Sequence, residues 1–124
     1  MSYPNDWPEG CPPNDAEPAF GIVFRGVKTN PPTEDDFLTY RELGKADRGK
    51  PCEAAGVSVF RDDKDAKHYI DKYPYTGNMI AKGTLSSDHG MVKPTARSLN
   101  GKKNSHTTWW PYESVNRPSL FSVV

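Results

Sequence analysis

The chain has 124 residues, which fits one domain and leaves little room for a second. Hydrophobic residues make up only 35% of it, and 12 prolines and 10 glycines interrupt it often, so we expect a thin core with long loops. The 16 basic and 16 acidic residues balance, which argues against a dedicated binder of nucleic acid or of a membrane surface.

The start of the chain carries neither the basic region nor the apolar run of a cleaved signal. No apolar stretch approaches the roughly 18 residues that a membrane span needs. We therefore expect a cytoplasmic protein without a membrane partner, and we leave open export by a route that uses no cleaved signal.

Residues 1–18 contain five prolines among acidic residues and asparagines. Proline fixes φ and removes a backbone donor, so this composition predicts an extended tail or a wrapped arm. Tyr3 and Trp7 are the aromatic side chains that could anchor it. We expect a single α+β domain over residues 19–124.

The first half of this domain predicts two strands with a helix between them. Residues 20–27 are apolar, β-branched and aromatic, which indicates a buried strand. Thr33 can cap a helix that ends at Gly44, with three acidic residues in its first turn. A polar loop then leads to Ala55, and residues 56–60 predict the second strand.

The second half predicts one more helix and further strands. Asp62 or Asp63 caps this helix, and apolar side chains recur along it at helical spacing up to Tyr73, before Pro74 ends it. After this helix we expect a strand at residues 79–85 and a long polar loop at residues 86–104. A further strand follows at residues 106–110, and a short strand or docked tail at residues 120–124. This order predicts an α+β fold with a small mixed or antiparallel sheet and two helices.

Cys11 and Cys52 are the two cysteines of the chain. Two cysteines are too few for a secreted disulfide scaffold, and no ligand spacing predicts a metal site. We expect free thiols, and a bridge between them would mainly pin the arm.

Arg25 stands near the end of an otherwise apolar strand, next to Gly26. An unpaired buried charge is costly, so Arg25 needs an anionic partner or a path to water. Its planar donors suit a phosphate or carboxylate, and the adjacent glycine lets a ligand approach the backbone. Either a bound anion or an ordinary structural partner satisfies this pattern.

Residues 105–111 form the least ordinary segment of the chain. Strand alternation places His106, Thr108 and Trp110 on one face. An imidazole, a hydroxyl and a large aromatic surface together can bind a flat ring and orient a hydroxyl group. A histidine at a sheet edge beside core tryptophans gives the same pattern.

Three segments, in this order along the chain, resemble the ADP-ribosyltransferase superfamily. They are Val-Phe-Arg-Gly-Val at 23–27, Gly-Val-Ser-Val-Phe at 56–60 and Ser-His-Thr-Thr-Trp-Trp-Pro at 105–111. The middle and late segments look most similar to small NAD-dependent toxins that bacteria inject by type VI secretion. The resemblance implies an ADP-ribosyltransferase-like fold, NAD as substrate, and a protein acceptor or an immunity protein as partner.

The same resemblance implies roles for individual residues. Arg25, beside Gly26, would clamp the phosphates or a ribose of NAD, and Ser58 would support the nicotinamide ribose. Tyr69 or Tyr73 would lie near the nicotinamide ring. His106 would stand near the bond that breaks, with Trp110 on the same strand face.

The catalytic carboxylate of the superfamily has no clear counterpart here. The chain contains no Glu-x-Glu or Gln-x-Glu, and its only late glutamate is Glu113. Such a carboxylate stabilises the cation that forms as the glycosidic bond breaks. We therefore expect that Glu113 serves, that His106 and Thr108 replace it, or that the domain is inactive.

Two other classes of protein remain open. His89 and His106 could act as general acid and base of a metal-independent ribonuclease, beside four cations at Lys93, Arg97, Lys102 and Lys103. Exposed aromatic residues at 109–112 would instead suit a non-enzymatic protein-binding module.

Overall fold

The computed structural model describes residues 1–99 and 102–124, and within them the chain folds around a seven-stranded sheet. All pairings in this sheet are antiparallel, in the order β1-β5-β8-β3-β2-β4-β9. The strands are β1 (Glu17–Pro18), β2 (Gly21–Val27), β3 (Val57–Phe60), β4 (Met79–Leu85), β5 (Met91–Pro94), β8 (His106–Trp110) and β9 (Phe121–Val123). A separate two-stranded ladder joins β6 (Ser98–Leu99) and β7 (Lys102–Lys103).

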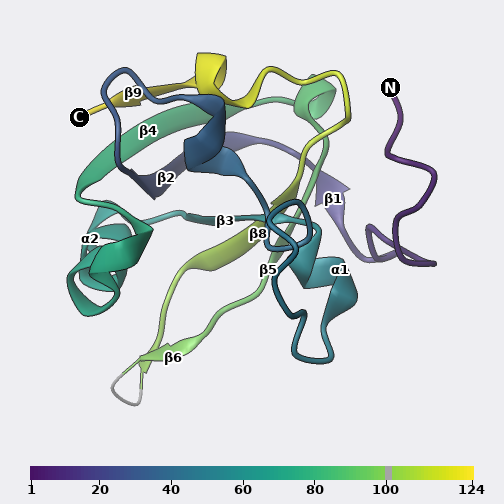
Figure 1. Ribbon diagram of the computed structural model, residues 1–124, viewed down its shortest axis with the longest axis horizontal. Coiled ribbons are helices and arrows are strands. Elements are labelled where there is room, and N and C mark those ends of the chain that lie inside the picture. The colour runs from purple at the N-terminus through teal and green to yellow at the C-terminus, as the bar shows by residue number, and fades with distance from the viewer. Residues whose placement is uncertain (100–101) are drawn as a thin grey trace.

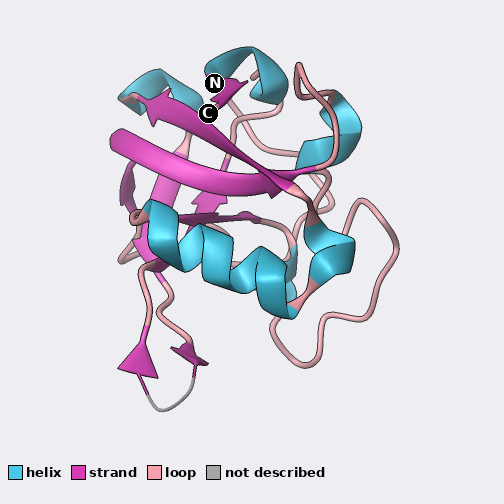
Figure 2. Cartoon of the chain, turned by 90° about the vertical axis from the view of Figure 1, so that its left-hand side faces the viewer, coloured by secondary structure: helices cyan, strands magenta, loops and turns pink. Residues whose placement is uncertain are grey.

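Two α-helices accompany the sheet, α1 (Pro51–Ala54) and α2 (Asp63–Lys72). Asp62 caps α2 by accepting a hydrogen bond of 2.8 Å from the backbone N–H of Lys64. Figure 2 shows α2 lying along the sheet and the β6–β7 ladder projecting away from the body. The prediction of a small antiparallel α+β fold with two helices is confirmed in these terms.

Short 3₁₀ turns complete the secondary structure, at Glu34–Phe37, Pro74–Thr76, Ser87–His89 and Arg117–Leu120. The helix expected from Thr33 to Gly44 is wrong, because only the first of these turns forms there. Asp36 accepts from the backbone N–H groups of Lys28 (2.8 Å) and Thr33 (3.0 Å), and Leu38 already has an extended backbone. The acidic residues thus cap a turn instead of starting a long helix.

The polar stretch 86–104 is not the single loop that we expected. Val92 of β5 is buried between the half-exposed Met91 and Lys93, and β5 pairs with both β1 and β8. Because β5 is short and lies in a mostly polar stretch, its one buried residue did not stand out in the sequence. Part of the expected loop, residues 100–101, lies outside the described residues. The expected loop 45–55 likewise contains α1.

The hydrophobic core lies on one face of the sheet. Its largest buried side chains include Trp109 on β8 and Phe37 in the first turn, and valines of β2 and β3 pack with them. Phe37 lies 4.8 Å from Phe121 between ring centroids, so the C-terminal strand closes this face. Helix α2 packs on the opposite face. Its Ile70 lies so close to β2 that a Cβ on Gly26 would overlap the Ile70 side chain.

The N-terminal arm, residues 1–18, packs against the body beside α1 (Figure 1). The ring of Tyr3 stacks on Trp7 at 4.7 Å, and its hydroxyl donates to the Trp110 carbonyl at 2.9 Å. Cys11 and Cys52 form a disulfide, so the expectation of free thiols is wrong. The fold brings Cys11 of the arm against α1, which sequence distance alone did not reveal.

Among the described residues, no helix has both the length and the apolar character that crossing a membrane requires.

Candidate functional site

The candidate site lies where β2 and β3 separate. β2 pairs with β4 along all seven of its residues, but with β3 only at Phe24 and Phe60. The side chain of Arg25 occupies the opening beyond that pair. Its Nε donates to the Asp36 carbonyl at 2.9 Å, and its Nη1 donates to the Ser58 carbonyl at 2.7 Å.

Arg25 is held by neutral carbonyl groups and not by a carboxylate. Burial lowers the pKa of Arg25 to about 10, and the nearby charge of Asp36 partly offsets this, so the guanidinium remains charged at neutral pH. The Asp36 carboxylate accepts from Thr29, from Lys28 and from Thr33, and no described carboxylate forms an ion pair with Arg25. A partly buried cation without a counter-ion therefore faces the opening.

A cavity of about 180 Å³ opens beside this guanidinium. Several polar side-chain atoms of its wall make no hydrogen bond within the described part of the chain, among them Arg25 Nη2, Ser58 Oγ and Tyr69 Oη. Since no buried side-chain polar atom there lacks a partner, these three groups are accessible from outside the protein. They are donors that a ligand could use.

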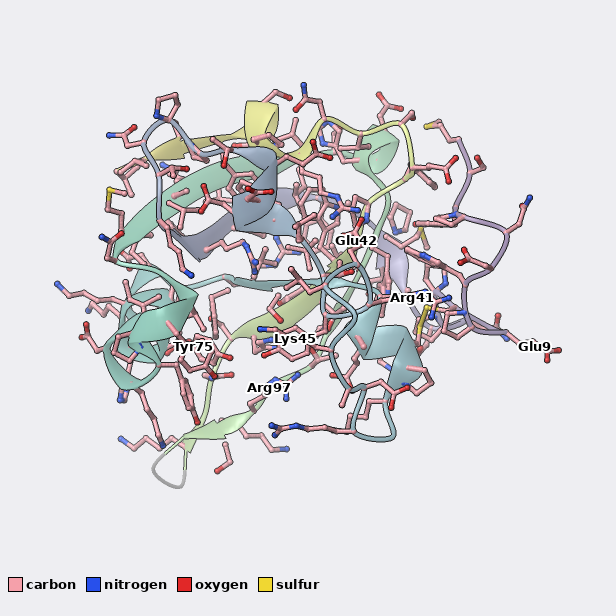
Figure 3. The ribbon with its side chains drawn as sticks, in the orientation of Figure 1. Glu9, Arg41, Glu42, Lys45, Tyr75 and Arg97 are labelled. Atoms are coloured by element: carbon pink, nitrogen blue, oxygen red, sulfur yellow. A yellow bond between two sulfur atoms is a disulfide. The ribbon has the colours of Figure 1, made fainter. Side chains whose placement is uncertain are left out.

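The mouth of the cavity carries aromatic rings and cations. Tyr40, Leu43 and Tyr75 line it and are 44%, 47% and 62% exposed. Lys45 lies with its ammonium 5.4 Å from the centre of the Tyr40 ring. Figure 3 shows Lys45 and Tyr75 on the same open face of the molecule. The site thus joins an anion-binding base to an aromatic rim.

Gly26 also lines the cavity, but its main effect is on packing. Only the absence of a Cβ lets Ile70 of α2 approach β2 so closely. The glycine therefore fixes the helix that carries Tyr69 to the wall of the site.

Of the two tyrosines predicted on α2, only Tyr69 lines the cavity. Burial raises the pKa of Tyr69, so its hydroxyl remains protonated at neutral pH. Tyr73 caps the end of α2 and packs on Tyr69, with ring centroids 5.0 Å apart. Tyr73 therefore supports a wall residue but does not reach the cavity.

His106 and Thr108 do share a face of β8, joined through Thr95. The Thr95 hydroxyl lies 2.8 Å from both His106 Nδ1 and Thr108 Oγ1. On the other side of the ring, Arg97 Nε donates to His106 Nε2 at 3.4 Å. His106 packs edge-on against Phe60, so it lies behind the cavity wall and not in the cavity.

The surroundings of His106 keep its ring neutral. Burial lowers its pKa to about 4, and the positive charge of Arg97 acts in the same direction. Between about pH 4 and pH 6.5 the unfolded chain therefore binds a proton at His106 that the folded chain does not. Stability that is present above pH 6.5 is lost as the pH falls through this range.

We expect acidification from pH 7 to pH 4.5 to lower the unfolding free energy of the wild type by up to about 3 kcal/mol, because of the titration of His106. His106→Gln should lose this part of the pH dependence, whereas His68→Gln, at an exposed position of α2, should keep it. Urea unfolding at the two pH values measures the difference. Equal pH dependence in wild type and His106→Gln would contradict the assignment.

Trp110 lies outside the cavity and does not offer its ring to a ligand. It is 1% exposed, and its Nε1 donates to the Cys52 carbonyl at 2.8 Å. Trp109 is buried as well and donates to the His89 carbonyl at 2.9 Å. The aromatic patch expected at residues 109–112 is therefore core for the most part, with only Tyr112 half-exposed.

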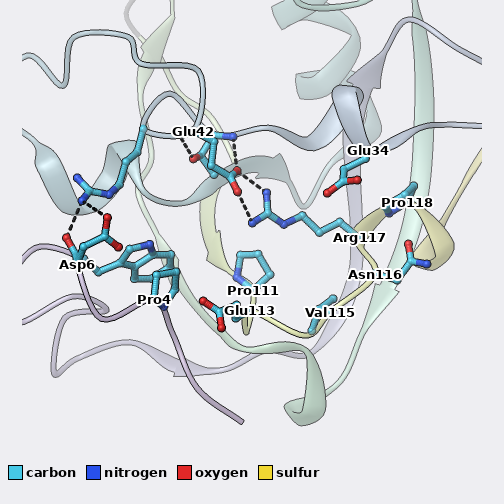
Figure 4. Close-up of a pocket in the computed structure, with 13 residues that line it drawn as sticks. Pro4, Asp6, Glu34, Glu42, Pro111, Glu113, Val115, Asn116, Arg117 and Pro118 are labelled. Carbon is cyan, nitrogen blue, oxygen red and sulfur yellow. Dashed lines mark hydrogen bonds and ion pairs between the residues drawn. The ribbon is translucent and has the colours of Figure 1, made fainter.

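Glu113 lies at a different cavity, of about 620 Å³, between the arm and the C-terminal segment (Figure 4). The structure thus does not bring Glu113 to the opening that holds Arg25, Ser58 and Tyr69. Asp35, which the sequence did not single out, is the exposed carboxylate that lines the opening. The wall also includes Tyr40, Lys45 and Tyr75. The sequence placed Tyr40 in a helix that does not form, and it gave no functional signal for Lys45 or Tyr75.

His89 and His106 lie near opposite ends of β8. The pairing of Met91 with Trp110 and of Pro94 with Thr107 separates them by most of the strand. His89 Nδ1 accepts from the backbone N–H of Ser86 at 2.9 Å. The two imidazoles therefore do not form an acid–base pair.

No protein family, curated protein or solved structure matches this chain in sequence or fold.

Proposed function

We propose that the protein binds NAD at the opening between β2 and β3 and acts as an ADP-ribosyltransferase-like protein. The observation that supports this most is the convergence of Arg25, Ser58 and Tyr69 on one cavity, each with an unused polar atom. These residues come from three separate elements, and the sequence resemblance implies NAD contacts for Arg25, Ser58 and one of the two tyrosines Tyr69 and Tyr73.

Each group has a chemical use toward NAD. Arg25 Nη2 can donate to a phosphate or ribose oxygen, because its other donors already fix the guanidinium plane. The face of Tyr69, which is half-exposed, suits a flat nicotinamide ring. A cavity of about 180 Å³ is smaller than the ~300–1,000 Å³ of typical ligand sites, so the rest of the dinucleotide would lie across Tyr40 and Tyr75.

The reaction breaks the bond between the nicotinamide nitrogen and the ribose carbon. Nicotinamide leaves with the bonding electron pair, and the acceptor hydroxyl or amine attacks the cationic sugar and gives up its proton. We assign the stabilising carboxylate and proton acceptor to Asp35, because it lines the opening and forms no described ion pair. Asp35→Asn should abolish nicotinamide release while NAD still binds.

Arg25→Lys is expected to weaken NAD binding about tenfold or more. A lysine ammonium cannot hold the Ser58 and Asp36 carbonyls and still present a planar fork to the ligand. A titration with NAD, followed through backbone amide resonances of the labelled protein, measures the affinity and shows that the variant is folded.

Arg61→Lys is the matched control. Arg61 also donates to strand carbonyls, those of Phe20 (2.6 Å) and Ile22 (3.3 Å), but it lies outside this cavity. NAD affinity should be unchanged in this variant. The absence of resonance shifts at millimolar NAD, or equal affinity in wild type and Arg25→Lys, would overturn the proposal.

The two other classes receive no support from these positions. A ribonuclease of the expected kind needs His89 and His106 together, and β8 separates them. A docking surface built on Trp109 and Trp110 needs exposed indoles, and both are buried.

A further inference from the structure

A second cavity, larger than the proposed NAD site, lies apart from it and shares no wall residue with it. Its volume is about 620 Å³, within the range of typical ligand sites. Three segments that are distant in the sequence build it: the arm, the first turn with the residues after it, and the C-terminal segment. They contribute Pro4, Asp6 and Trp7; Glu34, Thr39, Arg41 and Glu42; and Pro111, Glu113, Val115, Asn116, Arg117 and Pro118. Figure 4 shows these walls facing one another.

The two arginines of this cavity are already paired. Arg117 holds both oxygens of Glu42, at 2.6 and 3.1 Å, and donates to the Phe37 carbonyl at 2.8 Å. Arg41 donates to the Asp6 carbonyl at 2.6 Å and lies 3.6 Å from its carboxylate. Neither guanidinium is therefore available to attract an anion.

Two carboxylates of the same cavity are left without a cation. Glu34 and Glu113 are exposed and form no ion pair within the described residues. In Figure 4 they stand at different ends of the cavity, with the paired Arg117 between them. The residual charge of the cavity is negative, which favours a cationic ligand.

The apolar part of the wall points to the same kind of ligand. Trp7 stacks one face on Tyr3, and it is the one indole whose Nε1 forms no hydrogen bond within residues 1–99 and 102–124. Prolines make up much of the remaining wall, at positions 4, 111 and 118. A rigid aromatic face beside carboxylates attracts a guanidinium and covers its aliphatic stem.

We propose that this cavity binds an arginine side chain in an extended segment of a partner protein. The guanidinium pairs with Glu113 or Glu34, since a planar fork of donors matches a carboxylate. The stem lies on Trp7 and Pro4, and the indole N–H meets a backbone carbonyl of the segment. This interface is independent of the proposed NAD chemistry, because no residue serves both cavities.

The test is a titration of the full-length protein with a short peptide in which arginine alternates with glycine. The indole N–H resonances report separately, because Trp109 and Trp110 are buried and bonded. We expect only the Trp7 indole to shift, and the shift should weaken with added salt. A peptide with lysine in place of arginine should bind more weakly than the arginine peptide, and a peptide with glutamine should bind most weakly.

The variant Glu34→Gln with Glu113→Gln should weaken the arginine peptide about three- to tenfold, because it removes both carboxylates with which the guanidinium can pair. Its charge-matched control is Glu9→Gln with Asp88→Asn, at exposed positions outside the cavity, which should bind as the wild type does. Trp7→Leu, followed by anisotropy of a labelled peptide, should lose binding about tenfold.

Three results would overturn the proposal. One is the absence of any Trp7 shift at millimolar peptide. Another is an equal loss of affinity in the cavity variant and in its charge-matched control, which would show attraction to the overall charge only. The third is tight binding of spermine without binding of the peptide, which would make the cavity a polyamine site.

Discussion

Replacing Gly90 by alanine should unfold a large part of the population, with a loss of about 4 kcal/mol or more of unfolding free energy. Gly90 has φ of 120°, a conformation that side chains disfavour. A Cβ there would collide with the Trp110 carbonyl oxygen and come within 2.9 Å of Pro111 Cα. All of the atoms that it meets are backbone atoms, which cannot rotate away.

Urea unfolding followed by circular dichroism measures this loss. Gly44→Ala is the matched control, because Gly44 also has a positive φ, of 70°, but a Cβ there meets no atom. Gly44→Ala should lower the unfolding free energy by only about 1–2 kcal/mol, because a residue with a Cβ is strained in the left-handed region. A similar loss in both variants would show that backbone strain and not the collision dominates.

Removal of the disulfide should have the second-largest effect. The bridge joins residues 41 positions apart, and closing a loop of that length lowers the entropy of the unfolded chain by an amount equivalent to about 4 kcal/mol. Cys11→Ser with Cys52→Ser should therefore lower the unfolding free energy by about 2–4 kcal/mol.

The measurement compares unfolding with and without a dithiol reductant. The wild type should lose stability on reduction, whereas the double variant should be insensitive to the reductant. If reduction leaves the wild type unchanged, the many other contacts of the arm, such as Tyr3 with Trp110, would be sufficient to hold it.

Segments with a clear period were predictable from the sequence. Residues 79–85 and 106–110 form strands with those bounds, and α2 begins after the aspartate that was expected to cap it. In each case local side-chain pattern and tertiary packing agree. The acidic residues after Thr33 led to the wrong prediction of a helix, because residues that favour the start of a helix also cap an isolated turn.

The site was partly predictable for a similar reason. Arg25 stood out because a charge in an apolar strand needs an explanation, and its partners in the structure supply one. Tyr40 and Lys45 were not predicted as site residues, since only the fold brings the segment after the first turn to the same cavity as Ser58. Glu113 was assigned by its type alone, and the arm proved to be its neighbour instead.

The order of strands has a consequence for how the molecule behaves among its copies. The two outermost strands are those nearest the chain ends, β1 with two residues and β9 with three. Exposed sheet edges recruit other chains when they are long and regular, and short edges or prolines prevent this. Pro18 has no N–H to offer at one edge, and the strand at the other edge is only three residues long. The two edge strands therefore limit edge-to-edge association of the sheet.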